Sequence, residues 1–287
     1  MVRPTGLAWR AARICYHESI MPIARINDHD LYYEVHGSGD PLLVMGGWGT
    51  YCHGGEKNLA RGLTDRYSVV IFDYRGIGES TDDTRIPASI ALHAADAIGL
   101  LEHLGFRRVH LVGLVGIGAC ICQEIAITRS DLARSLVNMG AWCHVDDFLR
   151  DQLEMFRWLH RDAGFFAFQK AVTLLSFDPD FYNENRARLL GENGGWKELN
   201  GRFVTHSRLI DACVGYDSRD RLHRIQCPAL IIHAGQDQVT SPRVTLPIER
   251  GIANAVGVMM QDVAHVVAGR DQKRRFCEIL LPFLAAH

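Results

Sequence analysis

The chain lacks long apolar runs, strong net charge and a regular cysteine framework. No uninterrupted apolar stretch approaches the roughly twenty residues that span a bilayer, so no transmembrane helix is expected. A formal net charge of −2 at pH 7 gives no basic footprint for nucleic acid or for an anionic membrane. The eight cysteines are scattered, without paired CxxC motifs, which predicts reduced thiols, no bound metal and a cytoplasmic location.

The first twenty residues lack the apolar core of a secretory signal. Such a signal needs about 7 to 15 consecutive apolar residues, whereas residues 1–20 are mildly basic and precede a second methionine, Met21. We expect residues 1–20 to be a flexible extension or the product of an upstream start. The chain has 287 residues and is 47% hydrophobic, which is enough for one large α/β domain with an insertion.

The most informative absence is that of a nucleophile in residues 111–124, LVGLVGIGACICQE. An apolar strand, a glycine-rich turn and a helix form the pattern of a nucleophile elbow, which raises one side chain above a sheet. No serine, threonine or aspartate occurs in this turn. Counting from Gly113 places Val115 at the nucleophile position, whereas counting back from the helix places Gly116 there. We prefer Gly116, because glycine adopts positive φ without steric cost and a β-branched residue does not.

Two other functions of this turn are disfavoured. Cys120 and Cys122 fall in the following helix, where small buried cysteines are far commoner than nucleophiles. The order Gly113, Gly116, Gly118 does not match the GxGxxG fingerprint of dinucleotide binding. We therefore expect no cofactor.

Other parts of the chain predict a parallel sheet. Apolar strands are expected at 67–73, 108–113 and 133–139, and a helix with apolar residues at helical spacing is expected at 89–104. Gly105 follows that helix as a natural stop. Alternating strands and helices are typical of βαβ units, which place a ligand at the carboxyl ends of the strands.

Three loops that follow predicted strands contain candidate active-site residues. PLLVMGG is followed by Trp48, PALIIHAGQDQVT contains Asp237, and QDVAHVV contains His265. Together with YSVVIFDYRGIGES and the elbow, in the order elbow, Asp, His, these motifs resemble the α/β-hydrolase superfamily. The likeness is greatest to small-molecule hydrolases of the enol-lactonase and meta-cleavage-product type, although those enzymes use a nucleophilic serine.

The resemblance implies a fold and a division of the chain. The fold is an α/β-hydrolase fold, a mostly parallel eight-stranded sheet flanked by helices, with a helical cap inserted above the active site. Residues 21–142 and 218–287 would form the core, and residues 143–217 the cap. The cap segment is rich in aromatic residues, which favours a small hydrophobic or aromatic substrate bound out of water.

The resemblance also implies roles for individual residues. Asp237 would be the acid that orients His265, and the backbone N–H groups of Trp48 and Ile117 would form an oxyanion hole. Without a nucleophile, the His–Asp dyad remains a general acid and base. It suits direct-water hydrolysis, C–C cleavage, decarboxylation or other lyase chemistry on an activated carbonyl compound.

Further candidates surround this site. His53 follows the oxyanion loop and is a weak candidate for substrate contact, as are Trp158 and Phe165 of the cap. Asp146 and Asp147 follow a strand where some superfamily members place an alternative acid. Carboxylates at the start of a helix, favoured by the helix dipole, are the better interpretation.

A non-catalytic function is the alternative. A family of stress- and growth-regulated animal proteins has this fold and a serine-free, glycine-rich elbow, and acts by binding partners. Fold alone does not separate the two functions. A decayed site has no need of Asp237 and His265 at matched loop positions, so we favour the enzyme, with a homodimer left open.

Overall fold

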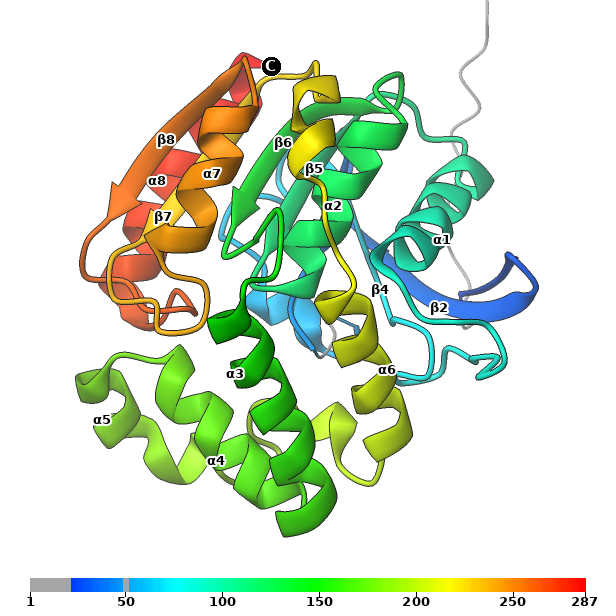
Figure 1. The fold of residues 1–287 in the computed structure, drawn as a ribbon. Helices are drawn as coiled ribbons and strands as arrows, with labels where there is room; N and C mark the ends of the chain where they lie inside the picture. Colours follow the sequence, from blue (N-terminus) through cyan, green and yellow to red (C-terminus); the bar gives the residue numbers. More distant parts are fainter. Residues whose placement is uncertain (1–21, 49–51) are drawn as a thin grey trace, which may run out of the picture.

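The computed structural model describes residues 22–48 and 52–287 (Figure 1). The extension expected at residues 1–20 lies outside the described residues. Eight strands form one sheet in the order β1-β2-β4-β3-β5-β6-β7-β8. Strand β2 pairs antiparallel with β1 and with β4, and the remaining neighbours are parallel. This is the mostly parallel eight-stranded sheet that the sequence predicts.

The strands and helices follow the expected alternation. The strands are β1 (Ile23–Ile26), β2 (His29–His36), β3 (Asp40–Met45), β4 (Tyr67–Phe72), β5 (Val109–Leu114), β6 (Ala133–Met139), β7 (Ala229–Ala234) and β8 (Ala255–Met260). The α-helices of the described residues are α1 (Ile90–His103), α2 (Ile117–Thr128), α3 (Asp147–Trp158), α4 (Phe165–Ser176), α5 (Pro179–Leu189), α6 (Phe203–Val214), α7 (Pro242–Gly251) and α8 (Gly269–Ala286). Short helical turns are η1 (Gly55–Asn58), η2 (Leu159–Ala163), η3 (Lys197–Leu199) and η4 (Arg219–Arg224). The three strands and the helix expected from the apolar pattern are confirmed to within one residue at each end.

Two apolar layers cover the sheet, one on each face. Side chains of a strand alternate between the faces, and in β3 Leu43 and Met45 pack with helices α1, α2 and α7. Leu42 and Val44 of the same strand pack with helix α8 on the other face. A parallel sheet buried on both faces needs continuous apolar strands, which explains why the strands read as short apolar runs.

Helices α3 to α6 fall within the segment expected to form the cap, and they lie together at one end of the molecule (Figure 1). We refer to this group of helices and their connecting loops as the cap. The backbone N–H of Ser218 donates to the carbonyl of Cys143 at 2.7 Å, so the chain leaves and re-enters the core at adjacent points. Asp146 caps α3 by accepting the N–H of Leu149 at 3.0 Å, as the helix-start interpretation predicts. None of the described helices combines the length and apolar composition of a membrane span.

Candidate active site

The turn between β5 and α2 contains the predicted nucleophile position. Strand β5 ends at Leu114 and α2 begins at Ile117, so Val115 and Gly116 form the turn. Gly116 has φ 64° and ψ −122°, and its carbonyl accepts the N–H of Cys120 at 3.2 Å. The structure therefore places Gly116 directly before the helix, in a backbone conformation that favours glycine.

Val115 is the strained residue of this turn. Its φ of 62° is an outlier for a β-branched side chain and costs on the order of 1 to 3 kcal/mol. The N–H of Val115 donates to the carbonyl of Met139 at 2.8 Å, and the N–H of Gly116 donates to Gly140 at 2.9 Å. Bonds to β6 and to the residue after it thus hold the elbow in a strained shape although it carries no nucleophilic side chain.

Two glycines allow the elbow to pack closely. A Cβ atom on Gly118 would lie 2.2 Å from the carbonyl oxygen of Gly46, and one on Gly113 would lie 2.6 Å from the Cα of Ala119. Neither position accommodates a side chain unless the backbone moves. The Gly118 contact brings the start of α2 against the loop that carries Trp48.

The start of α2 and the loop after β3 form the candidate oxyanion hole. Ile117 is the first residue of α2, so its N–H has no partner within the helix. Ile117 and Trp48 both line one small cavity. Backbone N–H groups at a helix N-terminus carry partial positive charge, which suits them to stabilise a developing oxyanion. The structure thus brings the two predicted oxyanion residues to one place.

His265 and Asp237 form a buried hydrogen-bonded pair. The Nδ1 atom of His265 lies 2.9 Å from Oδ2 of Asp237. Asp237 follows β7 and His265 follows β8, so both come from loops at the carboxyl ends of neighbouring parallel strands. When Nδ1 donates its proton to the carboxylate, Nε2 is left as a base.

Asp237 is held by further donors that the sequence analysis does not identify. Its Oδ1 accepts the N–H groups of Val239 and Thr240, both at 2.7 Å, and its Oδ2 accepts the Thr240 hydroxyl at 2.8 Å. Burial alone raises the pKa of the Asp237 carboxyl, but the His265 imidazole and these hydrogen bonds outweigh burial and bring that pKa below its usual value. The sequence DQVT, with a threonine three residues after the acid, is the signal that could have indicated this role.

A cavity of about 40 Å³ lies between the elbow and the cap. A single water molecule needs roughly 10 to 15 Å³ on this scale, so the cavity has room for about three water-sized groups. The walls are apolar apart from the backbone and His265. The lining includes Gly116, Ile117 and His265 from the core and Leu153, Phe156, Val172 and Trp196 from the cap.

The three weaker candidates for substrate contact do not line this cavity. Trp158 is 53% exposed on α3, and Phe165 is buried in the cap, where its ring packs against Phe168. His53 stacks on Tyr32 and its Nε2 lies 2.7 Å from Oδ2 of Asp73. Helix packing directs Trp158 and Phe165 away from the cavity, and the contacts with Tyr32 and Asp73 do the same for His53. The cavity therefore does not support a role in substrate binding for any of the three.

Trp196 is the cavity residue that the sequence analysis misses most clearly. It lies in the loop between α5 and η3 with φ 61°, and it also contacts the edge of the Phe177 ring. In the surrounding sequence, GENGGWKELNG, the apolar residues do not recur with the spacing of a helix or a strand, so nothing local indicates that this indole faces the active site.

The cysteines near the elbow are core residues. Cys120 and Cys122 are fully buried, and burial raises the pKa of both thiols well above its usual value. Neither is a thiolate at neutral pH, which removes them as nucleophiles. All cysteines in the described part of the chain are free thiols, as expected from their scattered positions.

A larger groove approaches the same residues from another side. It has a volume of about 1360 Å³ and lies between the segment 56–66 and helix α8. Val115 and His265 border both the groove and the small cavity. No cap residue of the described chain lines the groove, so it approaches His265 from a side that the cap does not cover.

Comparison with known proteins identifies the family of this chain. The model described as "alpha/beta hydrolase fold" matches residues 40–268. The chain belongs to the α/β-hydrolase family. Among similar α/β-hydrolases, an Azorhizobium caulinodans protein named "Putative carbamate hydrolase RutD" is 31% identical over 235 residues, which is 82% of this chain and 88% of that protein.

A second relative and a solved structure are similar to most of this chain. A Stutzerimonas stutzeri α/β-hydrolase of the same name is 26% identical over 259 residues, covering 89% of this chain and 97% of its own. The crystal structure of the enol-lactonase from Burkholderia xenovorans LB400 matches with a TM-score of 0.79 at 19% identity, covering 92% of this chain and all of that one (100%). The enol-lactonase likeness shows the fold alone.

Proposed function

We propose that this α/β-hydrolase cleaves a small carbamate-type carbonyl compound with a water molecule that His265 activates. The observation that carries the proposal is that His265, paired with Asp237, lines one cavity with Trp48 and Ile117. The elbow residues Val115 and Gly116 in the same cavity have no side chain that could act as a nucleophile. The names of two relatives supply the substrate class, since both are described as carbamate hydrolases.

The size of the cavity supports a substrate smaller than the aromatic compounds considered from the sequence. A carbamate ion has four non-hydrogen atoms, which matches the space for about three water-sized groups in a cavity of about 40 Å³. An aromatic ring exceeds that space. An expanded cavity is therefore needed for any ring-containing substrate.

The proposed reaction needs no covalent intermediate with the protein. Nε2 of His265 takes a proton from water as the water oxygen attacks the carbonyl carbon. The N–H groups of Trp48 and Ile117 stabilise the negative charge that develops on the carbonyl oxygen. His265 then returns the proton to the leaving nitrogen and the C–N bond breaks, so that carbamate and water become ammonia and hydrogen carbonate.

Asp237 supports both proton transfers. Its carboxylate fixes the imidazole tautomer and stabilises the imidazolium that forms after the first transfer. The groove beside α8 supplies water to His265 from a side that the cap does not line. Hydrolysis then continues while the small substrate occupies the cavity.

The test is ammonia release from carbamate and small carbamate esters, with small simple esters and enol-lactones followed in parallel by mass spectrometry. The parent protein should release ammonia from carbamates faster than the spontaneous reaction does. In His265→Gln the enzymatic rate above the spontaneous rate should be at least about 100-fold lower. His103→Gln, which changes an exposed histidine at the end of α1, is the matched control. A parent protein inactive on every compound would reject the hydrolase and favour the binding protein.

A further inference from the structure

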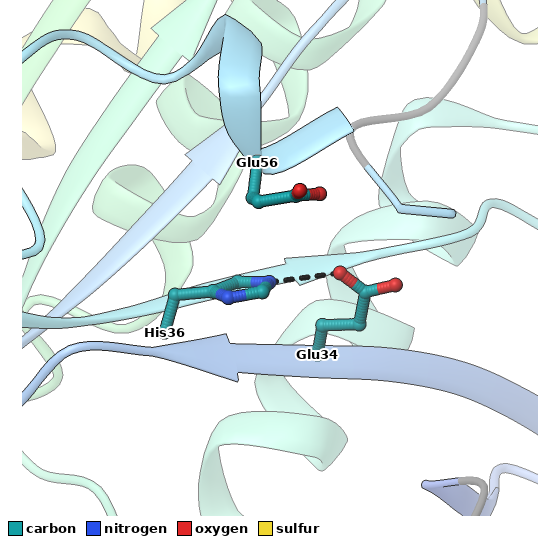
Figure 2. Close-up of side chains that lie close together, drawn as sticks. All are labelled: Glu34, His36 and Glu56. Atoms are coloured by element: carbon teal, nitrogen blue, oxygen red, sulfur yellow. Dashed lines mark hydrogen bonds and ion pairs between the residues drawn. The ribbon is translucent and has the colours of Figure 1, made fainter. Parts of the chain in front are cut away.

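A cluster of metal-binding side chains lies outside the candidate active site. Glu34 and His36 are two residues apart on β2 and therefore share one face of the strand. Glu56 of η1 faces them from the neighbouring segment (Figure 2). One nitrogen or oxygen atom from each of the three side chains lies within 4.8 Å of the other two.

The cluster has more negative than positive charge. The Nε2 atom of His36 lies 2.8 Å from Oε2 of Glu34. Across residues 22–48 and 52–287, no lysine or arginine forms an ion pair with Glu34 or Glu56. Two carboxylates are thus balanced by at most one imidazolium, and a divalent cation between them would neutralise the excess charge.

Glu34 is held in position by groups outside the cluster. Its Oε1 accepts the hydroxyl of Tyr32 at 3.2 Å and the backbone N–H of His53 at 2.9 Å. The Glu34 side chain is only 15% exposed, and that of His36 is 29% exposed. The outer donors leave the second oxygen of Glu34 turned toward His36. Such donors orient the carboxylate ligands of protein metal sites and strengthen binding.

We propose that Glu34, His36 and Glu56 bind one Zn²⁺ ion. Imidazole nitrogen and carboxylate oxygen are zinc ligands at about 2.0 to 2.2 Å, whereas Mg²⁺ and Ca²⁺ prefer oxygen alone. Tetrahedral ligands at that distance are roughly 3.4 Å apart. Binding therefore requires the His36 and Glu34 ligand atoms, now 2.8 Å apart, to separate slightly and the exposed Glu56 side chain to complete the set. Water completes the coordination. This departs from the expectation of no metal, which rested on cysteine spacing.

The ion would join two segments that are distant in the sequence. Strand β2 supplies Glu34 and His36, and η1 supplies Glu56 from the segment that follows the oxyanion loop. His53, which lies just before η1, already links this segment to the sheet. Its backbone N–H donates to Glu34 on β2, and its ring pairs with Asp73 after β4. Zinc would therefore fix η1 on the sheet. It would also raise the melting temperature by an amount that grows with the logarithm of the Zn²⁺ concentration once that exceeds the dissociation constant.

The test uses the full chain, stripped of metal by dialysis against a chelator and titrated with Zn²⁺ in competition with a chromophoric chelator. The parent should bind one Zn²⁺ per chain at this site, and Glu56→Gln and His36→Gln should each weaken that binding at least about tenfold. Glu192→Gln and His103→Gln remove one exposed carboxylate and one exposed imidazole elsewhere, and should bind as the parent does.

A second measurement separates binding from folding. Zn²⁺ should raise the melting temperature of the parent and both controls but not that of Glu56→Gln or His36→Gln, while all five proteins should melt alike without metal. Excess Mg²⁺ should leave the Zn²⁺ titration unchanged. The proposal is overturned if the parent binds no Zn²⁺ at micromolar concentration, or if the cluster variants and the controls bind it equally.

Discussion

The hydroxyl of Thr240 lies 2.8 Å from Oδ2 of Asp237, the same oxygen that accepts the imidazole N–H of His265. The backbone N–H of Thr240 donates to the other oxygen at 2.7 Å. One residue therefore holds both oxygens of the acid, and the orientation of His265 depends on it.

Replacing Thr240 by valine should impair turnover without removing the dyad. The lost hydrogen bond to a charged acceptor is worth about 1.5 to 3 kcal/mol, which corresponds to roughly a 10- to 100-fold fall in kcat if all of it is expressed in catalysis. Thr240→Ser keeps the hydroxyl and should retain most activity. Steady-state kinetics on the best carbamate compares the two, and equal losses would assign Thr240 a packing role.

Thr240→Val should also change the acid stability of the chain. The pKa of Asp237 is depressed in the folded state, so its contribution to stability is present above the unfolded value of about 3.9 and is lost as the pH falls through the folded pKa. Without the hydroxyl, the folded pKa of Asp237 rises and this contribution shrinks. Urea unfolding between neutral and acidic pH should show a smaller loss on acidification than in the parent.

Gly116→Ser should create a reactive elbow. Among the described residues other than its chain neighbours, only Trp142 lies within 4 Å of a Cβ atom at Gly116, at 3.9 Å, so space for the side chain exists. The backbone, with φ 64° and ψ −122°, lies outside the left-handed helical region and would strain a serine by about 1 to 3 kcal/mol. The serine hydroxyl would face His265 across the cavity. A fluorophosphonate probe should label this variant and leave both the parent and Gly116→Ala unlabelled at the elbow, as peptide mass spectrometry would show.

Trp196→Ala should widen the range of substrates. The indole closes the small cavity from the cap, and its removal should admit longer or ring-containing carbamates and esters while weakening selection for the smallest one. Trp158→Ala is the matched control, because Trp158 is exposed and does not line the cavity. The ratio of kcat/KM between a large and a small substrate should rise in the first variant alone.

His206→Gln should make the cap less sensitive to acid. The Nδ1 atoms of His206 and His160 lie 2.9 Å apart in the cap, and burial, followed by the charge of His160, lowers the pKa of His206 to about 3. Since the folded pKa lies below the unfolded value, stability is present above about pH 6.5 and falls by about 1.4 kcal/mol per unit below it. Unfolding free energies should show a shallower slope in the variant than in the parent, because the contribution of His206 is gone, whereas His103→Gln should keep the parent's slope.

The sequence by itself determined the sheet and the chain order of the site. Short apolar runs ended by glycine specify buried parallel strands, because both faces of such strands are covered. The loops after those strands must meet at one edge of the sheet, which is why Asp237, His265 and Trp48 could be predicted to converge. That Val115 and Gly116 have no hydroxyl, thiol or carboxylate is also a property of the sequence alone.

Only the tertiary structure decided which cap side chains face the cavity and how large it is. The orientation of a cap residue depends on how its helix or loop packs, so Trp158 points outward while Trp196, in a glycine-rich loop without period, closes the cavity. The contact between Glu56 and β2 could not be predicted from the sequence either. Local spacing places Glu34 and His36 on one face of the strand but does not relate them to a segment twenty residues later.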